Sequence, residues 1–380
     1  MHAAVLCAAA AGPTSHAADA ARSAASITDL RVEDPVLMKE RAALLDSAEA
    51  ALARGDTEAA LAAFERAAGM LHAPDTEMGL VRSQMQAGQY RRALAFAAHT
   101  AGAHLEAPEA SALYAWLLRA GGQEVYARQT LDAALLRSPG NEVLSLTQRA
   151  FAASTGIASG VLLERPHRMA PQALPAAGPS AVPGRARGQA SAVLLGDGRF
   201  ALAPSAGLAD ARRLWVRNGI GRVVAATVDR PFDDAGLVLL RLEQALPRAA
   251  ALAIAPRDPF AGSPGFAVDF AASADAAPQW PMLHAGFFGS ADRNGGRTPG
   301  IATSAGSAGA ALFDAGGRWA GIVLPGDAQG KARWLPLSAL RDRLGDLLPA
   351  PGEAAAPARV GADEAYERSL TLVLQVIVAP

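Results

Sequence analysis

Hydroxyl side chains and glycines are concentrated in the stretch TSAGSAGAALF, residues 303–313, where a tight backbone turn could present a nucleophile. A serine hydroxyl reacts only when a base within hydrogen-bond reach takes its proton and a third group holds that base in one tautomer. Between residues 154 and 380 the only imidazoles are His167 and His284, and the only lysine is Lys331. Any catalysis by Ser304 or Ser307 therefore depends on the elements that position these few bases.

Short apolar runs bounded by glycine, proline and aspartate follow one another from residue 191 to residue 337. They read SAVLLGDGRFALAP, RLWVRNGIGRVVAATV, AGLVLLRLE, GFAVDF, MLHAGFF, AALFDAGGRWAGIVLP and RWLPL. Asp-Gly and Asn-Gly pairs favour β-hairpins, and strands at regular spacing are typical of barrels and sandwiches. The pattern predicts a mostly β domain over residues 187–345.

In order and pattern these runs resemble a trypsin-like serine protease domain of the HtrA type, which implies two packed β-barrels. SAVLLGDGRFALAPSAGL is similar to the hairpin that ends at the catalytic histidine, and AALFDAGGRWAGIVLP to the nucleophile loop and the next strand pair. The histidine position falls on Ala206, or on Ser205 if the alignment shifts by one, the aspartate position on Asp234 or Gly236, and the nucleophile position on Ala308.

Because both the base and the nucleophile are replaced, the resemblance implies a protease fold that does not hydrolyse peptides. Gly306 and the amide of Ala308 would retain a vestigial oxyanion turn, and the cleft between the barrels could hold a peptide as an added strand. We expect His284 to be a half-buried strand histidine and Ser307 to point away from the catalytic position. The alternative is an active serine endopeptidase with a misaligned or non-standard triad.

A second pattern occupies the first half of the chain. Gly55, Gly88 and Gly122 are spaced by 33 and 34 residues, and each is followed five residues later by an alanine. Small residues at recurring positions let antiparallel helices approach closely. The pattern resembles tetratricopeptide repeats (TPRs), with three copies over 41–140 and a capping helix at 141–153, inside a helical domain at 38–153. A plain alanine-rich helical bundle is the alternative.

The two resemblances predict an α+β multidomain protein, an N-terminal α-helical TPR-like solenoid followed by a C-terminal all-β trypsin-like double barrel. A linker rich in proline and alanine joins them at 154–186. A tail at 346–380 ends in LTLVLQVIVAP, which we expect to add a strand, to pack on the domain or to bind a partner. The repeat resemblance implies a peptide-binding groove lined by Arg82, Met85, Trp116 and Arg119.

Charge and motif content argue against several other function classes. The net charge is −1 and the basic residues are spread along the chain, so no nucleic-acid surface is predicted. The sequence has no HExxH, CxxC or P-loop motif, so no metal site and no cofactor are predicted. No apolar run reaches the ~18 residues that a membrane-spanning helix requires. The expected partner is a protein or a peptide.

Residues 1–17, MHAAVLCAAAAGPTSHA, combine a short apolar run with a small-x-small ending, and they contain Cys7, the only cysteine. This pattern is typical of a secretory signal and predicts a periplasmic or secreted protein; otherwise the protein is cytoplasmic. The sequence as a whole predicts a catalytically inactive protease-like domain, fused to TPRs, that acts as a protein-binding or peptide-binding scaffold. A structural assembly factor that acts through the repeats alone is the third possibility.

Overall fold

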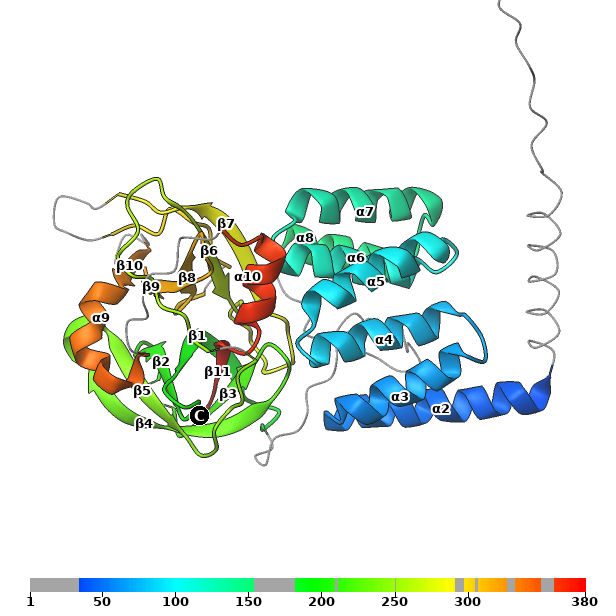
Figure 1. The fold of residues 1–380 in the computed structure, drawn as a ribbon, viewed down its shortest axis with the longest axis horizontal. Helices are drawn as coiled ribbons and strands as arrows, with labels where there is room; N and C mark the ends of the chain where they lie inside the picture. Colours follow the sequence, from blue (N-terminus) through cyan, green and yellow to red (C-terminus); the bar gives the residue numbers. More distant parts are fainter. Residues whose placement is uncertain are drawn as a thin grey trace, which may run out of the picture.

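The computed structural model describes residues 34–153, 182–208, 211–249, 251–290, 297–304, 307–326, 332–349 and 359–380. A helical module lies beside a module built mainly of strands (Figure 1). This layout confirms the α+β class that the sequence predicts. The expected signal segment, most of the linker, Gly306, His167 and Lys331 lie outside the described residues. Within the described ranges, no helix has the length and apolar character needed to cross a bilayer.

The helical module consists of consecutive helices that pack against their neighbours in the chain. They are α2 (Pro35–Arg54), α3 (Thr57–Ala68), α4 (Pro74–Gln86), α5 (Tyr90–Ala103), α6 (Pro108–Ala120), α7 (Glu124–Arg137) and α8 (Glu142–Ala152). Aspartates begin the first two, because the Asp34 carboxylate accepts from the Val36 amide and the Asp56 carboxylate accepts from the Ala59 amide. Pro74 and Pro108 each occupy the first position of a helix, where a missing amide proton costs least.

The same turn geometry recurs between the paired helices. Gly55, Gly88 and Gly122 have φ angles of 76°, 75° and 81°, in the left-handed region that favours glycine. The alanines five residues after them, Ala60, Ala93 and Ala127, have no exposed surface. The 33- and 34-residue spacing in the sequence therefore corresponds to a repeated helix pair, a geometry compatible with helical repeats.

The β module contains a closed barrel and a five-stranded sheet. The barrel order is β1 (Arg187–Leu195), β11 (Val373–Ala379), β3 (Arg213–Asn218), β4 (Val223–Phe232), β5 (Leu237–Leu242) and β2 (Phe200–Pro204). The sheet order is β10 (Arg333–Pro336), β9 (Trp319–Leu324), β8 (Ala311–Asp314), β6 (Pro264–Asp269) and β7 (Met282–Phe287). Helix α9 (Leu337–Leu344) follows β10, and α10 (Ala362–Ser369) precedes β11.

The C-terminal segment is an integral part of the barrel. Strand β11 pairs with β1 on one side and with β3 on the other, so that Val376 lies opposite both Ala190 and Val216. All seven residues of β11 are buried. The added strand expected near the C-terminus is therefore confirmed, but the β module extends beyond the expected boundary at residue 345, because β1 and β3 would otherwise be two unpaired edges.

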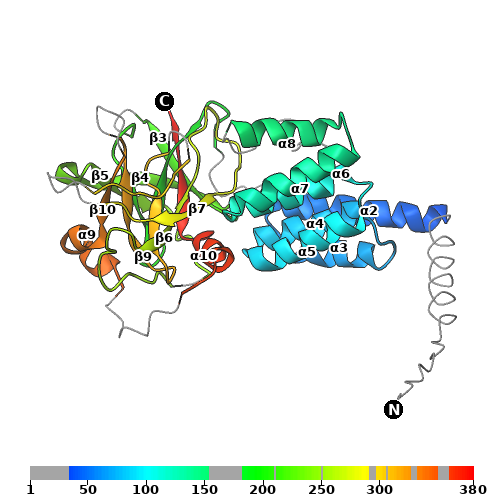
Figure 2. The same cartoon turned by 90° about the horizontal axis from the view of Figure 1, so that it is seen from above.

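Helix α10 joins the β module to the helical module, and it lies between them in both views (Figures 1 and 2). The buried Tyr366 ring meets the Tyr90 ring of α5 edge to face, with centroids 4.5 Å apart. The Tyr366 hydroxyl donates to the Pro281 carbonyl at 2.8 Å, and burial raises the pKa of Tyr366 well above its ordinary value. Arg91 donates to the Glu367 carboxylate at 2.9 Å. The two modules consequently share one apolar core.

A substitution at Gly122 can measure how closely the helical module packs against β7. In Gly122→Ala the new β-carbon would lie 2.9 Å from the Leu283 carbonyl oxygen of β7, at a backbone conformation that already disfavours alanine. Gly88→Ala has the same conformational cost, about 1–2 kcal/mol, but its β-carbon meets only Ile220 at 3.6 Å. We expect Gly122→Ala to lower the free energy of unfolding in urea by clearly more than Gly88→Ala. Equal decreases in the free energy of unfolding for the two variants would show that β7 is not in close contact with the turn at Gly122.

Candidate functional site

The three positions at which the protease resemblance places a catalytic triad are carried by segments that meet at the end of β2. The Ser205 amide donates to the Gly236 carbonyl at 3.0 Å, next to Ala206. The Ser191 amide of β1 donates to the Ala308 carbonyl at 2.7 Å. At Gly309, where φ is 83°, an added β-carbon would lie 2.7 Å from Cδ of Pro204. Backbone hydrogen bonds and close backbone packing thus hold these three segments together.

Ala206, Gly236 and Ala308 supply neither a base nor a nucleophilic hydroxyl. Ala206 is exposed, Ala308 is half-buried, and Gly236 has a left-handed φ of 64°. The remaining acid, Asp234, forms an ion pair with Arg343 of α9. The hydrogen bond from Arg343 holds the pKa of Asp234 below its ordinary value. Asp234 is therefore held by α9, where it has no imidazole to orient.

A different serine, histidine and aspartate lie together on the five-stranded sheet. The Ser304 hydroxyl donates to Oδ1 of Asp269 at 2.6 Å, and the Ser304 amide donates to Oδ2 at 2.8 Å. Nε2 of His284 lies 3.3 Å from the Ser304 hydroxyl and 3.5 Å from Oδ1 of Asp269. His284 pairs with Ala267 in the sheet register, two residues before Asp269, so the two side chains share a face.

This cluster does not have the geometry of a catalytic triad. In a triad the imidazole lies between the serine and the acid, and each ring nitrogen contacts one of them. Here the single atom Nε2 faces both partners, and the Ser304 hydroxyl gives its proton directly to the fully buried Asp269. The expectation that His284 is a half-buried strand histidine is confirmed, since 23% of its side chain is exposed.

The cluster opens onto a cleft of about 360 Å³ between the helical module and β7. Its walls come from α6 and α7, from β7 and from residues 302–304. Two guanidinium groups, Arg119 and Arg128, lie 3.4 Å and 2.9 Å from the Glu124 carboxylate. With two cations and one anion, this wall carries a net positive charge. Ala285 and His284 form the opposite wall.

The four residues expected to line an open TPR groove are buried in this structure. The exposed fractions of Arg82, Met85, Trp116 and Arg119 are 3%, 0%, 2% and 6%. Arg82 forms an ion pair with Glu49, and Arg119 donates to the Ala150 and Phe151 carbonyls at the end of α8. These four residues do not form an open groove, because ion pairing, the following helices and the shared core cover them. Arg119 alone also reaches the cleft at β7.

Sequence reasoning did not select Asp269 as a site residue. A signal was present, since Asp269 is the one charged residue in the otherwise apolar strand stretch GFAVDF. A buried carboxylate requires hydrogen-bond donors or a cation nearby, but the sequence does not say that Ser304 and His284 provide the contacts. Ser307, by contrast, has a buried hydroxyl without a hydrogen-bond partner in the described part of the chain.

The sequence matches no protein-family model and no curated relative. Among solved structures, it is similar to the MamO protease domain from Magnetospirillum magneticum, at 18% identity and a TM-score of 0.32, over 45% of this chain and 94% of that one. A serine endoprotease from Yersinia pestis gives 18% identity and 0.35 over 42% and 57% of the two chains. The HtrA-type protease AlgW with a decapeptide gives 17% and 0.33 over 42% and 51%. The last two matches span about half of those chains, and at these scores the similarity supports no functional assignment.

The role of the Ser304 hydroxyl can be measured by unfolding in urea. Ser304→Ala leaves the buried Asp269 carboxylate without one of its donors, which should cost about 1–3 kcal/mol. Ser307→Ala removes a buried hydroxyl that has no hydrogen-bond partner among the described residues, and we expect no loss of stability. A Ser304→Ala protein as stable as Ser307→Ala would contradict the structural role of the cluster.

Proposed function

We propose that this protein binds polypeptide segments without cleaving them and acts as a scaffold or adaptor. In this proposal the β module is an inactive relative of trypsin-like proteases of the HtrA type. One observation carries the proposal: where the segments of the expected triad meet, the side chains are those of Ala206 and Ala308, with Gly236 beside them. Without a base at this point, a bound peptide carbonyl meets no activated nucleophile.

The cleft beside β7 is the proposed place of binding. Strand β7 lies at the end of its sheet and, among the described strands, pairs only with β6. The Gly122 turn covers this strand at Leu283, and the part of its outer edge beyond Leu283 can accept an extended peptide as a further strand, with main-chain hydrogen bonds providing affinity. Ala285 is exposed in the cleft, so a side chain of the peptide can lie there. The positive balance of Arg119, Arg128 and Glu124 favours a segment with an acidic side chain.

The helical module is, in the same proposal, of the tetratricopeptide type. Its support is the 33- and 34-residue spacing together with the recurring left-handed glycines and the buried alanines after them. We further propose export to the periplasm or the exterior, on the small-x-small pattern of residues 1–17. A folded protein that binds a polypeptide segment in the cleft at β7 without cleaving it would act as an adaptor.

The competing function is an endopeptidase that uses the cluster at Ser304. The observation in its favour is that Ser304 and His284 border one cleft and both contact the buried Asp269. Against it stands the hydrogen bond from Ser304 to Asp269, because a hydroxyl that donates to a buried carboxylate is not poised to give its proton to His284. An assembly factor that uses only the helical module differs from both, since it requires no ligand at β7.

Unfolded casein tests the proposal. We expect the full chain to bind it in a pull-down or by fluorescence anisotropy and to leave it uncut on prolonged incubation. Ala285→Trp should weaken binding at least tenfold, about 1.4 kcal/mol, because the indole fills the cleft along β7. Ala206→Trp, a matched change at another exposed alanine, should leave the affinity unchanged.

Three results would contradict this account. Cleavage of casein by the unchanged protein, but not by Ser304→Ala, would establish the endopeptidase. Equal binding by Ala285→Trp and the unchanged protein would exclude the cleft at β7. A greater loss with Ala206→Trp would place the peptide at the end of β2.

A further inference from the structure

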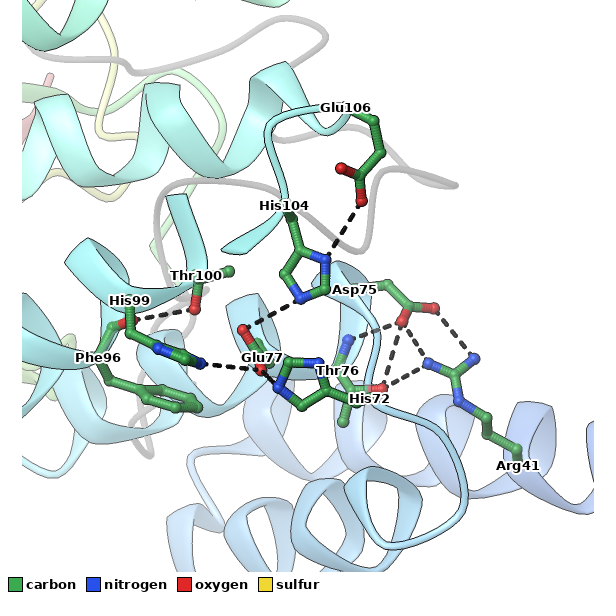
Figure 3. A network of polar contacts seen from close by, with 10 residues as sticks. All are labelled: Arg41, His72, Asp75, Thr76, Glu77, Phe96, His99, Thr100, His104 and Glu106. Carbon is green, nitrogen blue, oxygen red and sulfur yellow. Dashed lines mark hydrogen bonds and ion pairs between the residues drawn. The ribbon is translucent and has the colours of Figure 1, made fainter. Parts of the chain in front are cut away.

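Three histidines surround a buried glutamate at one end of α4 and α5 (Figure 3). His72 lies in the loop before α4, and Glu77 lies in the first turn of α4. His99 belongs to the last turn of α5, and His104 ends that helix. His72 and Glu77 therefore come from the start of the second helix pair, and His99 and His104 come from the end of that same pair.

The side chains converge on one carboxylate. Nε2 of His72 lies 2.5 Å from Oε1 of Glu77, and Nε2 of His99 lies 3.8 Å from the same oxygen. Nε2 of His104 lies 3.4 Å from Oε2. One ligand atom each from His72, Glu77 and His99 can be chosen so that all lie within 4.8 Å of one another. A single ion bound at about 2.0–2.2 Å from each donor fits between them once His72 moves slightly away from Glu77 and His99 moves slightly closer.

Two of the buried atoms have no hydrogen-bond partner in the described part of the chain, namely Nε2 of His104 and Oε2 of Glu77. The Glu77 side chain is only 3% exposed and the His104 side chain 10%. Nδ1 of His104 lies 3.2 Å from Oε1 of Glu106. When Nδ1 carries the proton for that hydrogen bond, the lone pair of Nε2 faces the lone pairs of Glu77 across the site. Two buried acceptors that face each other in this way are stabilised by a cation between them.

The surroundings hold these donors in place. The Arg41 guanidinium forms an ion pair with Asp75 and donates to the Thr76 hydroxyl, which fixes the first turn of α4. The positive charge of Arg41 is thereby compensated by Asp75 and does not oppose a cation at Glu77. The His72 and His99 side chains are 58% and 54% exposed, so an ion can enter from solvent.

We propose that His72, Glu77 and His99, with His104 as the fourth donor, bind a divalent transition-metal ion, and that this ion is zinc. Imidazole nitrogens with one carboxylate oxygen form a common zinc ligand set, and Glu106 on His104 repeats the carboxylate–histidine–zinc arrangement. The ion links the loop before α4 to the end of α5 and so holds the two helices of one pair together at their open end. The sequence motifs predict no metal site, because the donors form two pairs, His72 with Glu77 and His99 with His104, whose nearest members are 22 residues apart.

Zinc binding by the full chain tests this proposal. After EDTA treatment and removal of the chelator, the protein is titrated with Zn²⁺ by calorimetry and in competition with a chromophoric chelator. We expect one equivalent to bind and to raise the melting temperature. His72→Gln and His99→Gln should each weaken binding at least tenfold. Co²⁺ in place of Zn²⁺ should give the visible absorption of a tetrahedral nitrogen and oxygen site.

Histidines elsewhere in the chain provide the controls. His284→Gln, and a variant with alanine at His2, His16 and His167, should bind zinc as tightly as the unchanged protein. Circular dichroism establishes that each variant is folded. Failure of the folded, unchanged protein to bind Zn²⁺ would overturn the proposal, as would binding that persists in both His72→Gln and His99→Gln. Loss of zinc binding only in the control variants would also overturn it.

Discussion

The insertion of β11 between β1 and β3 is the constraint on which the rest of the structure depends. Its seven residues are buried and paired on both sides, so the last strand of the chain closes the barrel that the first strand opens. The same segment carries α10, whose Tyr366 packs on Tyr90 of the helical module. The barrel, the sheet and the helices are therefore fixed relative to one another, and the cleft between α6, α7 and β7 follows from that arrangement.

In this arrangement, hydrolysis by a serine requires a side chain that can accept the proton of its hydroxyl. The backbone at the end of β2 brings together the segments expected to carry a triad, but the side chains of Ala206 and Ala308 can neither accept nor donate a proton. The only imidazole in the described part of the β module, His284, shares one nitrogen between Ser304 and Asp269. These contacts hold His284 and Ser304 in place along the wall of the cleft.

The sequence predicted those features that depend on local pattern. The left-handed glycines follow from the 33- and 34-residue period, and the strand runs follow from apolar stretches between turn residues. What it could not predict depends on long-range packing. Arg82 and Trp116 were expected on an open face, yet ion pairs and the shared core bury them. The contact of Ser304 with Asp269, and that of Glu77 with three histidines, join residues whose proximity only the fold determines.

The central claim is that the β module contains no activated serine. Intact-protein mass spectrometry after treatment with a fluorophosphonate measures this directly, because such reagents form a stable adduct only with a serine whose proton is withdrawn by a neighbouring base. The account predicts that treatment leaves the mass of the full chain unchanged, as it does the mass of Ser304→Ala. A single adduct on the unchanged protein that is lost in Ser304→Ala or in Ser205→Ala would contradict it.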